Sequence, residues 1–340
     1  MAVTLKDIAQ ATGVSLSTVS RALHGNPMIP AKTTEYIRKI ADELGYVPNT
    51  VASGLRKTYS KVLGVLVRRI DDAFLAEVLQ GIEDVLYAEG YSLFVATSHR
   101  NPEREKAIFR TMSERRVDGA LICSTEVDQA HLHQLSQFGV PTVLINNLAT
   151  EDTTHSVCHD DISGGFDLTR HLIELGHTRI AYLGNKRSGR ITKDRLRGYK
   201  QALIQDGLTL RPEYIAAAPN GTTEGGVIGT QELLRSEPRP TAIVCFNDIL
   251  AIGVMYALRK AGLHVPVDCS VTGFDNIPLS EHINPSLTTF HQPRYELGVE
   301  AAEMMLRLLS RKNKNVNAAE VITLRGKLIV RESTMAPGID

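Results

Sequence analysis

Residues 4–23 read TLKDIAQATGVSLSTVSRAL, and this stretch predicts two short helices that are joined by a tight turn. Thr4 can cap a first helix over residues 5–11, and Ser15 can cap a second helix that ends with the stretch. Gly13 interrupts the chain between them, and a residue without a side chain suits two helices that cross closely. The stretch therefore predicts a helix-turn-helix.

A third amphipathic helix is expected after Pro30, with Gly45 as its end. In such a three-helix unit, the polar face of the second helix can read base edges in the major groove of DNA. The outward residues of that helix are expected to be Leu16, Ser17, Ser20 and Arg21. On these residues alone, the competing interpretation is a small helical bundle with a solvated polar face.

The charge is unevenly distributed along the 340 residues, although 38 Lys or Arg and 38 Asp or Glu make the net charge zero. Residues 1–61 hold eight Lys or Arg and four Asp or Glu, a net charge of +4 that leaves −4 for the rest. A basic N-terminal segment on a mildly acidic body favours a module that binds a polyanion.

The sequence also indicates the compartment. Lys6, Asp7 and Gln10 interrupt the N-terminus before an apolar run could form a signal peptide. No stretch approaches about 18 uncharged apolar residues, so no membrane span is expected. The four cysteines include no CxxC pair and most lie in apolar runs, which favours buried reduced thiols in a cytoplasmic protein.

Five short motifs occur together and in order in the first part of the chain. They are VTLKDIA (3–9), GVS (13–15), TVSR (18–21), LGYVPN (44–49) and ASGL (52–55). Their identity and spacing resemble the headpiece of the lac repressor/purine repressor family. This resemblance implies a sequence-specific, DNA-binding transcription regulator, and it outweighs the helical-bundle interpretation.

The resemblance implies a role for each matching position. Base-reading positions are Leu16, Ser17 and Arg21, and Thr18 lies in the same DNA-binding set. Hydroxyl or amide side chains that would touch phosphates are Thr4, Ser15, Ser20 and Asn26. Tyr46 and Asn49 would contact the DNA backbone as the chain enters the minor groove. Because Leu16 is aliphatic where the family often has a small or aromatic residue, the operator sequence cannot be copied from a relative.

Residues 49–57 resemble the hinge helix of the family, which orders only on the cognate DNA site. Leu55 matches the residue that wedges into the central base step, where it would kink the DNA and widen the minor groove. Ala52 belongs to the same DNA-binding segment, and Arg56 and Lys57 extend its basic path. The headpiece is therefore placed at residues 1–48 and the hinge helix with its linker at 49–60.

From Val62 onward, apolar runs alternate with helical stretches. The run VLGVLV at residues 62–67 is nearly continuous, as in a strand that is buried on both faces. Further strands are expected at residues 91–96, 119–123, 142–145, 156–158, 179–184, 241–245 and 270–274. Helices are expected at residues 73–89, from Pro102 onward, and at 129–138, 165–175 and 294–309. This alternation predicts βαβ units and parallel sheets.

A second group of motifs extends the resemblance over nearly the whole chain. It comprises VDG (117–119), LGH (175–177), FND (246–248), TGFD (272–275) and LTT (287–289). The fold class is therefore an all-α helix-turn-helix headpiece plus an α/β periplasmic-binding-protein-like core of two parallel-sheet subdomains. The core would span residues 61–340, with a first subdomain of about 61–160 and 292–325 and a second of about 161–291 and 326–340.

Polar residues after two strands predict a ligand site, because ligands of open α/β sheets bind beyond the carboxyl ends of strands. Asn247 and Asp275 have this position, and the resemblance matches them and Arg195 to effector-contacting positions. Their chemistry suits a polyol. Phe74 would lie against a sugar face, and Gln292 would bridge the subdomains. Weaker candidates are Ser124, Asn147 and Asn220, the last of which falls where some relatives carry an aromatic platform.

Each of these positions also has a plain structural interpretation. Asn247 and Asp248 could only cap the next helix, Asp275 could be a turn residue, and Arg195 could be a surface charge. A metal site among His155, Cys158, His159, Asp160 and Asp161 is disfavoured, because on a strand the two histidines would be about 13 Å apart. A helix-capping turn before Gly164 is the preferred interpretation there.

The sequence thus predicts a homodimeric bacterial repressor, cytoplasmic and nucleoid-associated, that binds a pseudo-palindromic operator in double-stranded DNA. Its effector would be a small carbohydrate or a derivative of one, and no catalytic residue, metal, cofactor or membrane partner is expected. Residues 336–340 carry no heptad extension, which favours a dimer over a tetramer. A regulator controlled by a protein corepressor or by a purine-type corepressor remains an alternative, whereas an uptake solute-binding protein should have a signal peptide and lack residues 1–57.

Overall fold

The computed structural model describes residues 3–46, 59–123, 137, 139–148, 154–310 and 319–338. The chain divides into two compact units, residues 1–60 and residues 61–340, which are called the N-terminal unit and the C-terminal unit below. Among the described residues, every helix is too short or too polar to cross a membrane.

The N-terminal unit contains three helices, α1 (Leu5–Thr12), α2 (Leu16–Leu23) and α3 (Ala31–Glu43). Both predicted caps are present, because the side chain of Thr4 accepts from the backbone of Asp7 and that of Ser15 accepts from the backbone of Thr18. Gly13 ends α1 with a φ of 71°, the left-handed conformation that glycine adopts without steric cost. The predicted helix-turn-helix is confirmed.

A small apolar core holds the three helices together. The buried side chains are one from α1, two from α2 and two from α3, namely Ile8, Val19, Ala22, Ile37 and Ala41. Because α2 turns Val19 and Ala22 inward, its opposite face is left to the solvent.

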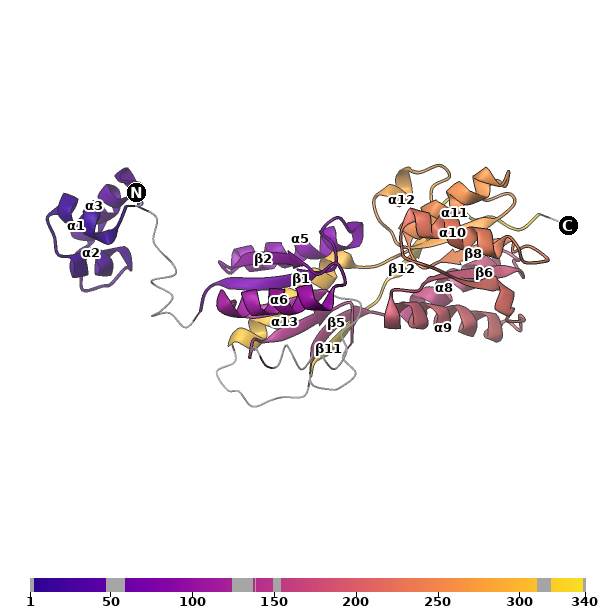
Figure 1. Cartoon of the computed structure of the whole chain (residues 1–340), viewed down its shortest axis with the longest axis horizontal. Coiled ribbons are helices and arrows are strands. Elements are labelled where there is room, and N and C mark those ends of the chain that lie inside the picture. Colours follow the sequence, from indigo (N-terminus) through magenta and orange to yellow (C-terminus); the bar gives the residue numbers. More distant parts are fainter. Residues whose placement is uncertain are drawn as a thin grey trace. The chain divides into compact units, whose positions relative to one another are not determined.

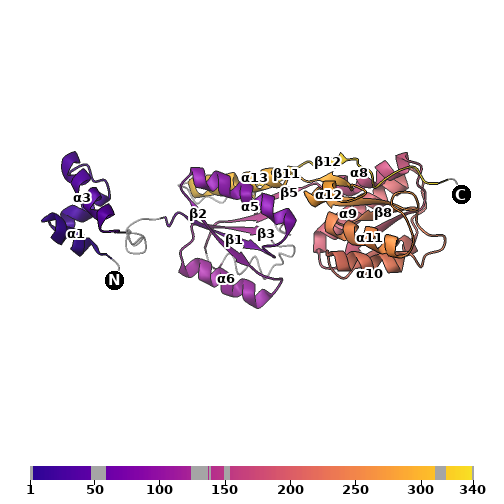
Figure 2. The ribbon, with the colours of Figure 1, turned by 90° about the horizontal axis from the view of Figure 1, so that it is seen from above.

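The first sheet of the C-terminal unit has six parallel strands in the order β11-β5-β4-β3-β1-β2. Figures 1 and 2 show α5 (Ala73–Ala88) and α13 (Arg294–Ser310) on one face of it and α6 (Pro102–Glu114) on the other. The strands are β1 (Val62–Val67), β2 (Ser92–Thr97), β3 (Gly119–Cys123), β4 (Thr142–Ile145), β5 (His155–His159) and β11 (Val321–Leu324). The winding reverses at β1, which pairs with both β2 and β3.

The second sheet repeats this plan, with the order β12-β10-β9-β8-β6-β7. The strands are β6 (Ile180–Asn185), β7 (Ile215–Ala218), β8 (Ala242–Cys245), β9 (Ser270–Asp275), β10 (Thr288–His291) and β12 (Lys327–Ile329). One face packs on α8 (Asp161–Glu174) and α9 (Gly189–Gln205), and the other on α10 (Thr223–Leu233) and α11 (Asp248–Lys260). Shorter elements are a 3₁₀ turn (Pro212–Tyr214) and α12 (Leu279–His282). The edge strand β12, which was not predicted from the sequence, is antiparallel to β10, whereas the other strands of this sheet pair in parallel.

The chain passes between the two sheets three times, from β5 to α8, from β10 to α13 and from β11 to β12. After the second passage α13 packs against α5 of the first sheet, which confirms the predicted return. The two helices meet backbone to backbone, since a Cβ on Gly298 would lie 2.1 Å from the carbonyl oxygen of Val78.

The helix that was expected from residue 165 begins four residues earlier, at Asp161. Asp160 causes the difference, because its Oδ1 accepts from the backbone of Ser163 at 3.0 Å and its Oδ2 accepts from the Ser163 hydroxyl at 2.6 Å. The predicted helix-capping turn is therefore present. The helix that was predicted over residues 129–138 falls almost wholly outside the described residues.

Candidate DNA-binding surface and ligand cavity

The outer face of α2 carries the residues that were predicted to read bases. Leu16, Ser17 and Arg21 are exposed, Leu16 with 51% of its surface free, and Ser20 is half-buried. An exposed leucine flanked by hydroxyls and a guanidinium has no role in the core of this unit. The arrangement fits insertion of α2 into a major groove.

Three hydroxyls gather at the start of α2. The Oγ of Ser15 accepts from the backbone of Thr18 at 3.2 Å, and it lies 2.9 Å from the Ser17 Oγ and 2.8 Å from the Thr18 Oγ1. The positive end of a helix dipole with several hydroxyl donors is a favourable place for a phosphate.

The other residues predicted to contact the DNA backbone make different contacts within the N-terminal unit. The Thr4 hydroxyl donates to the Asp7 carboxylate at 2.7 Å, and this hydrogen bond lowers the pKa of Asp7. Asn26 accepts from the backbone of Met28 through its Oδ1 at 2.9 Å, and Tyr46 packs half-buried against the core. The remaining predicted DNA contacts, Asn49, Ala52, Leu55 and Arg56, lie outside the described residues.

The C-terminal unit contains a cavity of about 450 Å³ at the carboxyl ends of strands from both sheets. Asn146 lines it, whereas the predicted Asn147 is buried beside it and accepts from the backbone of Leu148. Ser124 lies outside the described residues. The other predicted effector residues all line the cavity: Phe74, Arg195, Asn220, Asn247, Asp275 and Gln292.

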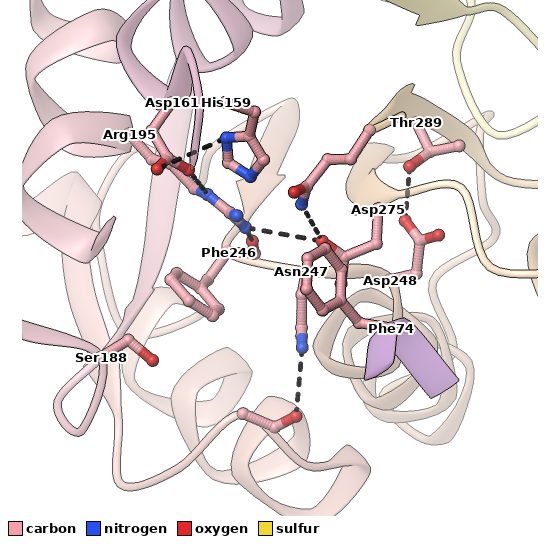
Figure 3. A network of polar contacts seen from close by, with 12 residues as sticks. Phe74, His159, Asp161, Ser188, Arg195, Phe246, Asn247, Asp248, Asp275 and Thr289 are labelled. Atoms are coloured by element: carbon pink, nitrogen blue, oxygen red, sulfur yellow. Dashed lines mark hydrogen bonds and ion pairs between the residues drawn. The ribbon is translucent and has the colours of Figure 1, made fainter. Parts of the chain in front are cut away.

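Arg195 is buried at the wall of the cavity, with 3% of its surface exposed, so it is not a surface charge. Its Nε donates to Asp161 at 2.8 Å, its Nη1 donates to the carbonyl of Phe246, and its guanidinium lies 3.6 Å from the ring centre of Phe274. Figure 3 shows this guanidinium between the Asp161 and Asp275 carboxylates. The Nδ1 of His159 lies 3.6 Å from the Oδ2 of Asp161, and burial lowers the pKa of His159.

Asp275 is more than a turn residue. Its φ of 117° is one that side-chain-bearing residues rarely adopt, and only 7% of its surface is exposed. Burial raises its pKa well above the usual range, against the opposing effect of nearby Arg195. It accepts a hydrogen bond from Nε2 of Gln292, whose Oε1 is buried without a partner.

Asn247 and Asp248 have different structural roles. Asn247 caps α11 by accepting from Leu250 at 2.9 Å, and its Nδ2 donates to the carbonyl of Gly221 at 3.4 Å. Asp248 is not the cap, because it is fully buried and accepts from the backbone of Ile277 at 2.8 Å and from the Thr289 hydroxyl at 2.5 Å. Burial raises the pKa of Asp248 to about 7.

Asn220 holds the loop before α10. Its Oδ1 accepts from the backbone of Thr222 at 3.2 Å and from the Thr222 hydroxyl at 2.6 Å. Its side-chain nitrogen is therefore the group that is left for a ligand.

Sequence reasoning missed part of the lining. Residues that immediately follow β1, β2, β4, β6 and β8 supply it, including Arg68, Arg69, His99, Arg100, Asn146, Arg187, Ser188 and Phe246. The strand-end rule that selected Asn247 and Asp275 would also have found most of these residues, had it been applied to every strand.

Family models match both units. A model described as bacterial regulatory proteins, lacI family, matches residues 4–49, and a periplasmic binding protein-like domain matches residues 169–334.

Curated relatives match over almost the whole chain. The HTH-type transcriptional repressor PurR of Vibrio vulnificus is 32% identical over 97% of this chain and 98% of its own length. Catabolite control protein A of Priestia megaterium is 32% identical over 98% and 100%, and the ribose operon repressor of Haemophilus influenzae is 33% identical over 97% and 98%.

Solved structures agree. The lac repressor dimer bound to operator and the anti-inducer ONPF superposes with a TM-score of 0.86 at 27% identity, covering 99% of this chain and 100% of that one. The complex of the transcriptional regulator CelR with cellobiose gives a TM-score of 0.75 at 28% identity, covering 97% and 99%.

A helix-turn-helix with an exposed polar face, on the same chain as two parallel-sheet layers around a cavity, defines a DNA-binding transcription regulator with a periplasmic-binding-protein-like core. Relatives of this extent and identity settle the family. The chain belongs to the lacI family of bacterial regulatory proteins. It is a DNA-binding transcriptional repressor and, like these relatives, not an enzyme.

Proposed function

We propose that the cavity binds a small, sugar-like effector and that this effector sets the affinity of the N-terminal unit for its operator. The observation that carries the proposal is the convergence of Arg195, Asp275 and Asn247 on one cavity of about 450 Å³. A cavity of this size matches a mono- or disaccharide. Phe74 and Phe246 add two aromatic rings to the lining, against which an apolar sugar face can lie.

Two acceptors favour a ligand with many hydroxyls. Asn146 Oδ1 and Gln292 Oε1 are buried without a hydrogen-bond partner, and both residues line the cavity. A buried acceptor without a partner carries a desolvation cost of about 1–3 kcal/mol. A hydroxyl donor from a polyol would remove that cost at both positions.

The DNA-binding half of the proposal uses α2 and the segment after α3. Leu16, Ser17 and Arg21 would read bases, with Thr18 in the same contact set. The residues that would contact the DNA backbone are Thr4, Ser15, Ser20, Asn26, Tyr46 and Asn49. Ala52, Leu55 and Arg56 would enter the minor groove at the centre of the site. We propose a cytoplasmic homodimer on a pseudo-palindromic operator, since two-fold related copies read two-fold related half-sites.

A buried arginine connects the loop at Asp275 in the cavity to helix α5 of the first sheet. Arg294, at the start of α13, donates to both carboxylate oxygens of Glu77 on α5, at 3.1 and 2.6 Å. It also donates to the carbonyls of Asp275 and Asn276, the latter at 3.0 Å. A ligand that moves the Asp275 loop would therefore act on α5 of the first sheet. We expect a coupling of about 1–3 kcal/mol between effector and operator.

A purine-type effector is the competing candidate, because a purine repressor is among the relatives. The aromatic rings of Phe, Tyr or Trp in the lining are limited to Phe74 and Phe246 among the described residues, and Asn220 occupies the position where an aromatic platform was considered. These features favour the polyol. Control by a protein corepressor would need no tight small ligand at all.

Isothermal calorimetry on the full chain with sugars, sugar derivatives and nucleobases tests the proposal. We expect a sugar or sugar derivative to bind and to change operator affinity in a fluorescence anisotropy titration. Binding by a nucleobase alone would favour the purine account. Intact operator binding without any small-molecule binding would favour the protein corepressor.

A further inference from the structure

A buried carboxylate behind the cavity holds Arg195 in place. Of the two carboxylates near its guanidinium, Asp161 accepts a hydrogen bond from Nε at 2.8 Å, whereas Asp275 lies 3.9 Å from Nη1. Asp161 has 2% of its surface exposed and does not line the cavity, so it would act on a ligand only through Arg195. A charge as deeply buried as Arg195 needs a paired countercharge, and Asp161 supplies it.

This pairing leaves part of the Arg195 guanidinium for a ligand. Its hydrogen bonds use Nε and Nη1, the latter to the carbonyl of Phe246, and Nη2 makes none with the described residues. The Cζ of Arg195 lies 4.6 Å and 3.6 Å from the ring centres of Phe246 and Phe274, which restrict its tilt. Because a guanidinium is planar and rigid, a fixed Nε also fixes the N–H groups of Nη2. The place of Asp161 therefore decides what Arg195 offers to a hydroxyl of the effector.

The second oxygen of Asp161 faces polar groups that also lack partners. Its Oδ2 is buried without a hydrogen bond, 3.6 Å from Nδ1 of His159 and 3.9 Å from Nη2 of Arg190. Both ring nitrogens of His159 and Nη2 of Arg190 are buried and make no hydrogen bond within the described part of the chain. Figure 3 shows one Asp161 oxygen facing Arg195 and the other facing His159. The two gaps exceed a hydrogen bond by less than about 1 Å, so a small rotation of the carboxylate can exchange its partners.

This cluster of buried groups lies at the first passage between the two sheets. His159 is the last residue of β5 in the first sheet, and Asp161 is the first residue of α8, which packs on the second. Arg190 and Arg195 come from α9 on the same face of the second sheet. A shift of the Asp161 carboxylate is therefore felt both at the cavity wall and where the chain crosses between the sheets.

The surroundings of His159 keep its ring uncharged at neutral pH. Burial lowers the pKa of His159, Asp161 opposes this effect, and Arg195 and Arg190 add to it. The other elements that contact the ring present no charge, since β9 contributes the ring of Phe274 and β11 pairs at Leu324.

We propose that Asp161 is a positioning residue for effector binding, whose carboxylate is shared between Arg195 at the cavity and His159 at the passage. While His159 is neutral, the carboxylate holds Arg195 in its binding position. A protonated His159 draws the same carboxylate toward Nδ1, and the effector then binds more weakly. This inference rests on the proposed function, because it concerns how the same cavity holds its ligand.

An NMR titration of the His159 ring tests the shared carboxylate without a ligand. The histidine rings are labelled with carbon-13, and the signal is assigned by its loss in His159→Gln. Arg195→Gln should raise the midpoint of the His159 titration and Asp161→Asn should lower it, each by about 1 pH unit, because a nearby charge is removed. Asp160→Asn is the control, since it removes the same charge one residue away and keeps a good helix cap. Midpoints that move no further in the two variants than in this control would overturn the inference.

Calorimetry on the full chain tests the effect on binding, with D-ribose, D-glucose and cellobiose as the probes. For a sugar that binds, Asp161→Asn should weaken binding about tenfold, the scale of one charge-assisted hydrogen bond, and Asp160→Asn should not. In the unaltered protein the affinity should fall between about pH 8 and pH 5, as His159 gains its proton. His159→Gln should show a flatter profile over this range. The same profile in both proteins would contradict the role of His159.

A failure of the proposed function and a failure of this inference give different results. No binding by any sugar would overturn the proposed function, while the NMR titration would still decide whether the carboxylate is shared. Sugar binding that Asp161→Asn leaves unchanged would overturn the inference and leave the sugar-like effector standing. Circular dichroism checks that each variant is folded. Where one is not, the unaltered protein replaces it: a saturating sugar should lower the midpoint of the His159 titration, and an unchanged midpoint would overturn the inference.

Discussion

The two units of this repressor present their binding residues in opposite ways. On α2 the residues proposed to contact DNA are close neighbours in sequence and mostly exposed, and their contacts span three or four positions. Around the cavity the side chains are largely buried and come from distant segments, as in the Arg195–Asp161 pair, 34 residues apart. A local surface can be changed without cost to the fold, whereas the cavity is part of the core that supports it.

The strongest test of this contrast is overpacking of the core. In Gly298→Ala, the new Cβ would meet the Val78 carbonyl oxygen at 2.1 Å, so α13 and α5 must separate. We expect the free energy of unfolding of the C-terminal unit to fall by about 3 kcal/mol. Urea denaturation followed by circular dichroism measures this change.

Gly338→Ala is the control, because a Cβ there meets nothing within 4 Å. Equal stability of Gly298→Ala and the unaltered protein would mean that the close crossing of α5 and α13 does not limit the core.

A second test uses the buried carboxyl of Asp248, whose pKa is raised from 3.8 to about 7 by burial. Between about pH 4 and 7 the carboxyl is protonated in the folded state but ionised in the unfolded state, so raising the pH favours unfolding. The contribution of this group to stability is therefore complete below about pH 4 and is lost as the pH rises through about 7. Relative to the unaltered protein, Asp248→Asn should gain a few kcal/mol of stability as the pH rises between these limits, because the shift spans about three pKa units. Urea midpoints measured across this pH range check it, and parallel profiles for the two proteins would refute it.

The third test changes the exposed surface alone. Arg21→Ala should weaken specific operator binding by about 2 kcal/mol, the scale of one bidentate base contact, and leave stability and effector binding unchanged. Lys39→Ala on α3 is the charge-matched control, and it should not alter the ratio of specific to non-specific affinity. Anisotropy titrations with operator and scrambled DNA measure both. Unchanged discrimination by Arg21→Ala would remove α2 from its assigned role.

The smallest expected effect concerns Asp275. Asp275→Ala should weaken the effector by about 1–2 kcal/mol, because a hydrogen-bonding group in the cavity is lost, while operator affinity without effector stays the same. Glu296→Ala, an exposed carboxylate on α13, is the control. Calorimetry measures the change, and equal effector affinity in both variants would place the ligand elsewhere.

The same contrast explains how far the sequence could predict the structure. Local signals were sufficient for the N-terminal unit, where Thr4, Gly13 and Ser15 each act within three or four residues. In the C-terminal unit, apolar runs indicated the strands β1 to β6, β8 and β9, but not β7, β10, β11 and β12. The antiparallel pairing of β12 also could not be predicted, because it depends on a passage between sheets late in the chain.

The cavity was predictable only in part. Asp275, Asn247 and Arg195 were found from their strand ends and from the family resemblance, yet Asn147 was chosen where Asn146 lines the cavity. Asn146 has a φ of 55°, a left-handed conformation that the apolar run before it does not predict. The partners of Arg195 and Arg294 likewise become visible only once distant segments are folded together.

The central claim is that binding of the effector in the cavity changes the affinity of the N-terminal unit for its operator. Operator affinity, measured by anisotropy on the full chain with and without saturating effector, tests it most directly. The account predicts a shift of about 1–3 kcal/mol in the unaltered protein and a smaller shift in Asp275→Ala at the same effector concentration. An effector that binds the cavity and leaves operator affinity unchanged would contradict it.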